Sequence, residues 1–244
     1  MGKIYARAAR YALYPNELGL CGPRGSEKGK LYQYLTTKKK VSDGQARKLL
    51  EQFTAAAAYL KLIAASNSIE DWLDLRVVDA YWIGNDLLNR VRPEDLKTMI
   101  LNLAAEGKMA APAAKEAAAR VHYQHRPHHS FHVMVIGGLS GQVERGSVGQ
   151  DLCRIGWGRV VGVGKNGTLT VSAKSLRRQG GRILSELEEE ERNVSVPRDP
   201  LLFPRVSVGD LVAFHWARVV EIIDEDAARR LEYWTKRTLA YFNK

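Results

Sequence analysis

Cys153 and His215 are the residues whose types and placement best suit metal chemistry in this chain. Cys153 is predicted to open the first barrel strand, which includes the apolar run 157–163, and His215 lies inside the apolar run 211–223. Both runs mix β-branched, aromatic and small residues, which favours strands with one face in a barrel core. Because the first and last strands of a small barrel pair on closure, we expect the thiol and the imidazole to lie close together near one barrel mouth. Such a pair suits a low-spin iron ion, since thiolate donates strongly and imidazole either ligates or donates a hydrogen bond.

The same pair has a second chemical interpretation, as the nucleophile and base of a cysteine hydrolase. That mechanism also needs an oxyanion hole and an orienting Asn or Asp, and no neighbouring motif marks either of them. We therefore expect a binding protein rather than an enzyme.

Cys21 is the third candidate metal ligand, in the turn-dense segment 16–23, NELGLCGP. A thiol beside Gly22 in a rigid turn is presented to a ligand without its own backbone in the way, and backbone amides there can stabilise a thiolate. The alternative is a small hydrophobe that fills a corner. The chain has two cysteines, which is too few for a disulfide framework, so we expect free thiols.

Five of the six histidines lie in the segment 122–132, HYQHRPHHSFH. Neutral imidazole suits nickel, zinc and iron, so a metal site is one interpretation of this cluster. However, Pro127 breaks any helical ligand register between His125 and His128. We predict instead that these histidines are structural, with their ring nitrogens hydrogen-bonded at a domain junction.

The C-terminal part of the chain, residues 153–244, carries a series of short motifs in a fixed order. They are Cys153, Gly158-Arg159-Val160-Val161, a variable hairpin, Val208-Gly209-Asp210-x-Val212-x-x-His215 and Asp224-Glu225-x-x-Ala228. This series resembles the HypC/HupF-type [NiFe]-hydrogenase assembly chaperones. Two features depart from that family, in which the cysteine follows the initiator Met and a proline stands where Trp157 stands here.

The resemblance implies a fold, a function, a cofactor and a partner. The fold is a small OB-like barrel, with Cys153 as the essential cysteine and His215 as the histidine of a conserved strand. The function is hydrogenase maturation, either by carrying an iron-dicyano-carbonyl fragment or by binding a hydrogenase large-subunit precursor or another maturation protein. In that family the iron is shared with a cysteine of a separate partner, and Cys21 is positioned to supply a second thiolate from within this chain. The whole chain also resembles an uncharacterised bacterial family with the NELG-x-CGP and HHSFH motifs, which brings no function with it.

The pattern along the chain predicts an α+β protein with an α-helical domain, 1–126, and an OB-like β-barrel domain with a C-terminal helix, 127–244. Helices are expected at 5–13 (stopping at Pro15), 31–35, 43–66 (capped by Asp43), 69–90, 93–103 and 111–123. Strands are expected at 131–136, 157–163, 168–171, 176–184 (with a turn at Gly180-Gly181), 194–196 and 211–222, with a connector at 137–150 and a last helix after the cap Asp224. A helical stripe of apolar residues is predicted to be core, namely Trp72, Val77, Val78, Tyr81, Trp82 and Leu88.

The bulk composition limits the class of protein. With 45% hydrophobic and 26% charged residues the chain reads as a soluble globular protein. No apolar run approaches the roughly 18 residues of a membrane span, and the first residues do not read as a secretory signal, so we expect a cytoplasmic location. The net charge of +10 suggests nucleic acid, but the basic runs, such as Lys38–Lys40, lack interleaved aromatic residues and nucleic acid is an unlikely partner. The alternative function is a non-metal adaptor or nucleic-acid-binding module on the same barrel.

Overall fold

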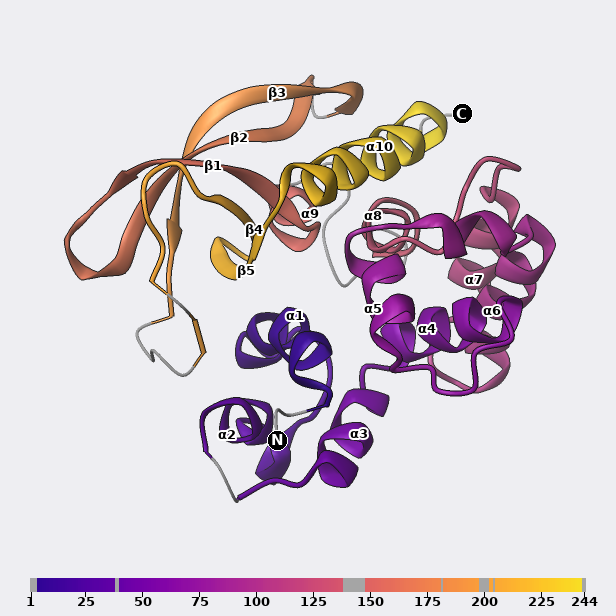
Figure 1. The fold of residues 1–244 in the computed structure, drawn as a ribbon. Coiled ribbons are helices and arrows are strands. Elements are labelled where there is room, and N and C mark those ends of the chain that lie inside the picture. The colour runs from indigo at the N-terminus through magenta and orange to yellow at the C-terminus, as the bar shows by residue number, and fades with distance from the viewer. Residues whose placement is uncertain are drawn as a thin grey trace.

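The computed structural model describes residues 4–37, 40–137, 148–180, 182–197, 202–203 and 205–242. It confirms the predicted α+β layout, with a helical N-terminal part, a closed five-stranded β-barrel and a C-terminal helix, α10 (Figure 1). The barrel lies to one side and α4 to α7 to the other, while α1 lies below strand β5 (Figure 1). Two sequence features fall outside the described residues, namely Lys38 and Lys39 of the basic run and positions 138–147 of the connector.

The helical part is built from short helices. They are α1 (Ala6–Glu17), α2 (Lys30–Thr36), α3 (Asp43–Glu51), α4 (Thr54–Ser66), α5 (Leu75–Trp82), α6 (Pro93–Ala105) and α7 (Ala111–Ala119), with 3-10 turns η1 (Gly25–Glu27) and η2 (Asp86–Arg90). The predicted stop before Pro15 is wrong, because Pro15 lies inside the last turn of α1. A proline so close to a helix end removes little of the hydrogen-bond ladder.

Two predicted long helices are interrupted. The helix expected at 43–66 is divided into α3 and α4, and its cap is Ser42, which forms a capping box with Gln45, rather than Asp43. The helix expected at 69–90 is reduced to α5, which ends before Gly84. There the backbone is left-handed, with φ +97°, and an added Cβ would lie 1.9 Å from Cδ1 of Trp234. The close approach of α10 therefore requires a glycine and a helix end at this point.

The barrel has the strand order β1-β2-β3-β5-β4. Its strands are β1 (Gly156–Val163), β2 (Thr168–Gln179), β3 (Arg182–Ser195), β4 (Leu211–His215) and β5 (Arg218–Ile223), with the 3-10 turn η4 (Lys165–Gly167) after β1. Strand β1 pairs antiparallel with both β2 and β4, while β3 closes the barrel through one parallel bridge to β5. The predicted strand at 211–222 is thus a hairpin of two strands.

The segment expected to be a strand at 131–136 is helical instead. It forms α8 (His129–Phe131) and the π-helix η3 (His132–Gly137). The apolar run 133–137 is buried throughout, and a short apolar run buried on all sides carries no periodicity that separates strand from helix. A further helix, α9 (Val148–Cys153), precedes β1, so Cys153 ends a helix rather than opening a strand.

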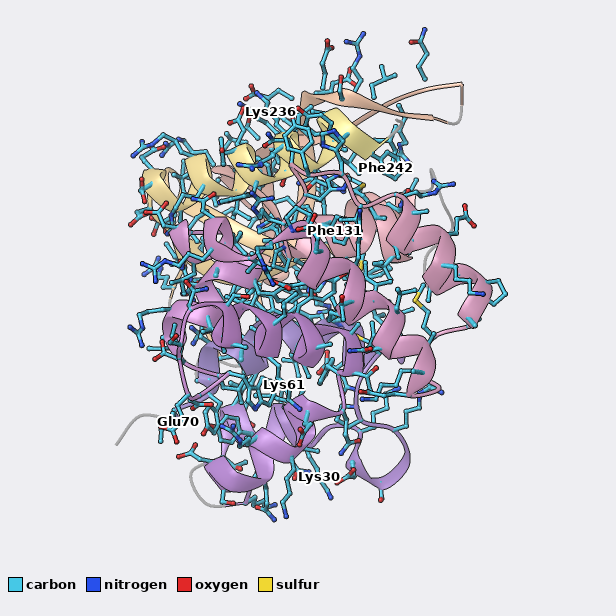
Figure 2. All side chains as sticks on the ribbon, turned by 90° about the vertical axis from the view of Figure 1, so that its right-hand side faces the viewer. Lys30, Lys61, Glu70, Phe131, Lys236 and Phe242 are labelled. Atoms are coloured by element: carbon cyan, nitrogen blue, oxygen red, sulfur yellow. The ribbon has the colours of Figure 1, made fainter. Side chains whose placement is uncertain are left out.

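One hydrophobic cluster runs from α1 to α10, and a second, smaller one fills the barrel. All six residues of the predicted stripe between Trp72 and Leu88 are buried, as expected. Phe131 is fully buried in the larger cluster and lies among side chains in the interior, whereas Lys30 and Lys236 lie near opposite ends of the molecule (Figure 2). The larger cluster includes residues from both sides of position 127, so the two predicted domains share part of one core. The domain boundary at this position stays a prediction.

Helix α10 (Glu225–Phe242) begins as the sequence indicates, with Asp224 accepting a hydrogen bond from the amide of Ala227 at 2.7 Å. It contacts α8 and η3 on one side and β1, β3 and β4 on the other. The helix thereby holds the barrel against the histidine-rich segment. Within the described residues, no helix combines the length and the apolar character that crossing a membrane requires.

Candidate metal centre

Cys153 and His215 lie together, each at the end of its element. Cys153 is the last residue of α9 and His215 the last residue of β4. The Cys153 Sγ and one ring nitrogen each of His215 and His129 all lie within 4.8 Å of one another. The antiparallel pairing of β1 with β4 brings these chain segments together, because Gly156 is the register partner of Phe214. An added Cβ at Gly156 would lie 2.2 Å from the Phe214 ring, so this approach depends on glycine.

The backbone around Cys153 is held on both sides. The next residue, Arg154, is fully buried, and its Nε donates to Asp151 Oδ1 at 2.8 Å. On the other side, the amide of Trp216 donates to the Leu152 carbonyl at 2.8 Å, which ties the β4–β5 turn to α9. A buried ion pair and a backbone hydrogen bond thus fix the position of the thiol relative to His215.

The hydrogen bonding of His215 leaves a ligand-type lone pair on the ring. Its Nδ1 lies 2.9 Å from the Tyr11 carbonyl, and because a carbonyl only accepts, Nδ1 carries the proton. Burial lowers the pKa of His215 to about 4, so the ring is neutral. Nε2 then carries the lone pair. The backbone of Cys153 lies near enough to raise the pKa of the ring slightly, but no hydrogen bond of normal geometry reaches the buried Nε2. A backbone carbonyl on one ring nitrogen and a free lone pair on the other is the usual arrangement of a metal-binding histidine.

His129 lies as close as His215, but both of its ring nitrogens have partners. Nε2 lies 2.9 Å from the Cys153 carbonyl and Nδ1 lies 3.1 Å from the Tyr81 hydroxyl. Since the carbonyl accepts from Nε2, the hydroxyl donates to Nδ1. His129 therefore orients the backbone of Cys153. The sequence analysis placed His129 in the structural cluster, and no spacing in HHSFH separates it from its neighbours.

A pocket of about 310 Å³ opens onto this group. Cys153, His129 and His215 line it together with Cys21 and His132. Hence all three cysteine and histidine residues predicted from the sequence as ligands line one cavity, but Cys21 is not among the three residues whose ligand atoms lie within 4.8 Å of one another. Whether they bind metal stays a prediction.

The turn that carries Cys21 is rigidly held. The side-chain amide of the buried Asn16 donates to the carbonyls of Cys21, at 3.0 Å, and of Pro23, at 2.8 Å. Gly22 has φ +80°, and an added Cβ would lie 2.3 Å from the ring of Phe53. The NELG-x-CGP motif therefore packs its turn against Phe53, which also lines the pocket.

The pocket wall has an uneven balance of charge. Among the described lining residues there is no carboxylate, while Arg24 and Lys108 contribute two cations. Both cations are exposed, and Lys108 is paired with Glu106 at 2.5 Å. A hydrated divalent cation is usually bound through carboxylates, so this wall favours a neutral or anionic occupant.

The two thiols are protonated in this environment. Burial raises the pKa of Cys153 to about 12, with a smaller opposing contribution from the Trp216 indole, and burial raises the pKa of Cys21 to about 12 as well. A thiolate ligand would be favoured by a nearby imidazolium or by a hydrogen bond. Burial keeps the His215 ring neutral, so no imidazolium is present there, whereas the Trp216 indole does lower the pKa of Cys153. A neutral thiol beside a neutral imidazole is not the ion pair of an activated nucleophile.

Several polar atoms of the wall lack partners. The indole nitrogens of Trp82 and Trp216 and Nδ1 of His132 are buried without a hydrogen bond of normal geometry. Each of these residues lines the pocket. Buried polar groups are almost always satisfied in folded proteins, by protein groups or by water, so these groups mark a place where water or a ligand in the cavity supplies the partners.

The remaining histidines of the cluster lie away from this pocket. His122 stacks on Tyr241, and the amide of His122 donates to Nδ1 of His125 at 3.0 Å. Nδ1 of His128 accepts from the amide of Ser130 at 3.2 Å. Their contacts at the junction with α10 agree with the predicted structural role, and so do the hydrogen bonds of both ring nitrogens of His129.

A family model described as "Family of unknown function (DUF6390)" matches residues 4–244. The chain belongs to this family. The match confirms the resemblance to an uncharacterised family, while the likeness of the C-terminal part to the hydrogenase chaperones stays a prediction. No curated protein and no solved structure gives a significant match.

Proposed function

We propose that this family member is an accessory protein of [NiFe]-hydrogenase maturation that binds an iron fragment through Cys153 and His215. The observation that carries the proposal is the free, buried Nε2 of His215 beside the Cys153 sulfur, in one pocket. The motif series from Cys153 to Ala228 supplies the biological setting, because it resembles the HypC/HupF-type chaperones. On this proposal the barrel is OB-like, the protein works in the cytoplasm without catalysing a reaction, and its partner is a hydrogenase large-subunit precursor or another maturation protein.

The donor set supports a complexed iron rather than a bare ion. Cys153 and His215 provide a soft and a borderline donor, a pairing that suits iron in preference to magnesium or calcium. Two protein donors leave coordination positions for ligands that arrive with the metal. The lack of a carboxylate among the described lining residues, together with Arg24 and Lys108, favours iron that already bears anionic ligands such as cyanide.

Cys21 supplies the second thiolate in this proposal. It lines the same pocket as Cys153, and the raised pKa of Cys153 has a contribution from the charge of Cys21. Its sulfur lies outside the group of ligand atoms within 4.8 Å of one another, so on this proposal Cys21 joins the iron as an additional ligand from elsewhere in the pocket. The family-level arrangement, in which a partner's cysteine shares the iron, is thereby replaced by a cysteine of the same chain.

Loading requires the thiol to lose its proton. Because the ligand form of cysteine is the thiolate, metal binding releases a proton and is favoured as the pH rises. Because the pKa of Cys153 is raised to about 12, the thiol is fully protonated at neutral pH, and one proton is released for each metal bound through it. His215, in contrast, binds metal without losing a proton, because its ring is neutral and the lone pair is already available.

Infrared spectroscopy tests the proposal directly. The full chain is purified anaerobically from cells that produce a [NiFe] hydrogenase, and its iron content is measured alongside the spectrum. We expect cyanide and carbonyl stretching bands with bound iron, lost in Cys153→Ser, which is nearly isosteric and preserves the fold. Absence of both iron and these bands from the wild-type protein would refute the proposal.

Cys21→Ser is the matched control, because the same substitution is made at the other cysteine that lines the pocket. We expect it to reduce the iron content without abolishing it. Unchanged loading in this variant would remove Cys21 from the ligand set while leaving the site at Cys153 and His215 in place.

A further inference from the structure

The turn between β4 and β5 has a backbone that its residues rarely adopt. Trp216 and Ala217 are both left-handed, with φ 53° and 55°. Two-residue hairpin turns of this kind strongly favour Asn-Gly, because side chains beyond Gly, Asn and Asp are strained there. A bulky residue held at positive φ is a true outlier, and such strain is concentrated at functional sites. The side chain of Trp216 therefore calls for a role outside the turn.

The surroundings of the turn hold Trp216 in place from two sides. Its own amide donates to the Leu152 carbonyl at 2.8 Å, next to Cys153, and the Ala217 carbonyl accepts from the amide of Ser195 at 2.9 Å. The turn thus links α9 to β3. This anchoring compensates for the backbone strain and directs the indole into the pocket, where it lines the wall with Cys153.

The indole N–H of Trp216 lines the same pocket as the Cys153 side chain and lowers the pKa of the thiol, but it has no partner of normal hydrogen-bond geometry. An indole nitrogen only donates, and a neutral thiol is a weak acceptor. A thiolate is a much stronger acceptor, because hydrogen bonds to ionised groups are shorter and roughly twice as strong. The donor therefore has a good partner only when the sulfur is negatively charged.

We propose that the indole N–H of Trp216 donates a hydrogen bond to Sγ of Cys153 when this cysteine binds metal as a thiolate. Trp216 is then a positioning residue that acts through the metal ligand. This inference rests on the proposed metal site at Cys153 and His215, but on no particular cargo. The hydrogen bond withdraws electron density from the sulfur and keeps it directed toward the Nε2 of His215, as outer-sphere donors do at other metal sites.

Cobalt(II) substitution under anaerobic conditions tests the inference, because a thiolate ligand to Co²⁺ gives a sulfur-to-metal charge-transfer absorption. The full-length wild type and Trp216→Phe are titrated with Co²⁺. Phenylalanine keeps an aromatic ring in the pocket and removes only the N–H donor. We expect the charge-transfer band of the variant to move to lower energy, since the sulfur electrons are held less tightly, and the Co²⁺ affinity to fall about 10-fold.

Trp72→Phe is the control for the loss of an indole elsewhere. Trp72 is buried but is not part of the pocket wall. The charge-transfer band and the Co²⁺ affinity of Trp72→Phe should therefore equal those of the wild type. If Trp216→Phe does not fold, as judged by circular dichroism, the same substitution is made together with Ala217→Gly, which relieves strain in the turn.

The outcomes separate this inference from the proposed function. A Trp216→Phe protein that binds Co²⁺ with an unchanged band and affinity overturns the role of Trp216 and leaves the metal site intact. A band that shifts only after cyanide is added also overturns it, because the N–H would then serve the added ligand. A wild-type protein without any thiolate-to-cobalt band instead refutes the metal site itself.

Discussion

His128, at the junction with α10, and His215, in the pocket, are equally buried, but their Nδ1 atoms form hydrogen bonds in opposite directions. Both are almost inaccessible to solvent, at 1% exposure each. Burial lowers both pKa values, to about 3 for His128 and about 4 for His215. In His128, however, Nδ1 accepts from the amide of Ser130, whereas in His215 Nδ1 donates to the Tyr11 carbonyl.

The difference decides which ring can ligate a metal. An accepting Nδ1 in a neutral ring places the proton on Nε2, and both nitrogens are then unable to bind an ion. A donating Nδ1 leaves the lone pair on Nε2. The molecule thus uses the same side chain as a helix cap at His128 and as a candidate ligand at His215, and the backbone group at Nδ1 makes the distinction.

The largest expected effect is on metal affinity. His215→Ala removes one of the two proposed metal ligands, the other being Cys153. Co²⁺ affinity should therefore fall by at least the roughly 100-fold that strong outer-sphere changes reach. His128→Ala should leave the affinity within a few-fold of the wild type. Isothermal titration with Co²⁺ under anaerobic conditions measures both. Equal losses in the two variants would show that the tautomer argument does not separate them.

The second effect is on the free energy of unfolding, for which the substitution at His128 is expected to matter even though it hardly changes metal affinity. His128→Ala removes a helix cap and leaves a cavity beside Trp234, whose ring lies 6.5 Å from that of His128. We expect a loss on the order of 2–3 kcal/mol in the free energy of unfolding. Urea denaturation measures this loss. A variant as stable as the wild type would mean that the junction tolerates the cavity and the lost cap.

A third effect is the pH dependence of stability, to which the buried histidines of the junction and of the pocket all contribute, because burial lowers the pKa of each. Burial lowers the pKa of His125 to about 4 and that of His128 to about 3, so both are neutral in the folded protein. In the unfolded chain they take up protons below pH about 6.5. Their contribution is therefore retained above that pH and is lost as the pH falls from 6.5 toward 4, by up to about 1.4 kcal/mol per pH unit for each ring.

Urea denaturation at pH 7.5 and pH 5 measures this dependence, with His125→Asn as the matched variant. The variant should lose less stability than the wild type between the two pH values, because one titrating ring is absent. Identical slopes would assign the acid sensitivity to other groups.

The smallest effect is expected at His132, which is neither a hydrogen-bonded junction histidine like His128 nor a candidate ligand like His215. It lines the pocket with an unpaired Nδ1, but it is not among the three residues whose ligand atoms lie within 4.8 Å of one another. His132→Ala should therefore change Co²⁺ affinity only a few-fold. A loss comparable with that of His215→Ala would move His132 into the ligand set.

Much of the architecture could be predicted from local patterns. The helical N-terminal part, the barrel, the last helix and its cap at Asp224 follow from apolar periodicity and capping residues, which act over a few neighbouring positions. The predictions of secondary structure were wrong where residues far apart in the sequence determine the local backbone. The end of α5 depends on Trp234 packing on Gly84, and the buried segment 133–137 has no polar face to reveal its period.

The candidate site shows the same division. The pairing of Cys153 with His215 was expected from the closure of a barrel, although Cys153 ends a helix and His215 ends a short strand. The part played by Trp216 was missed. Its signal was present, because residues 211–223 are long for one strand and His-Trp-Ala-Arg stands where a tight turn must form.

The sequence by itself determined which donors the chain possesses: two thiols, six imidazoles and the short-range signals that set most helices and strands. Only the tertiary structure decided what state each donor is in. The proton of His215 is placed by the carbonyl of Tyr11, more than two hundred positions away, and the thiol of Cys153 is kept protonated by burial. Tautomer and charge depend on the groups that surround a side chain in space, and no local pattern in the chain records those neighbours.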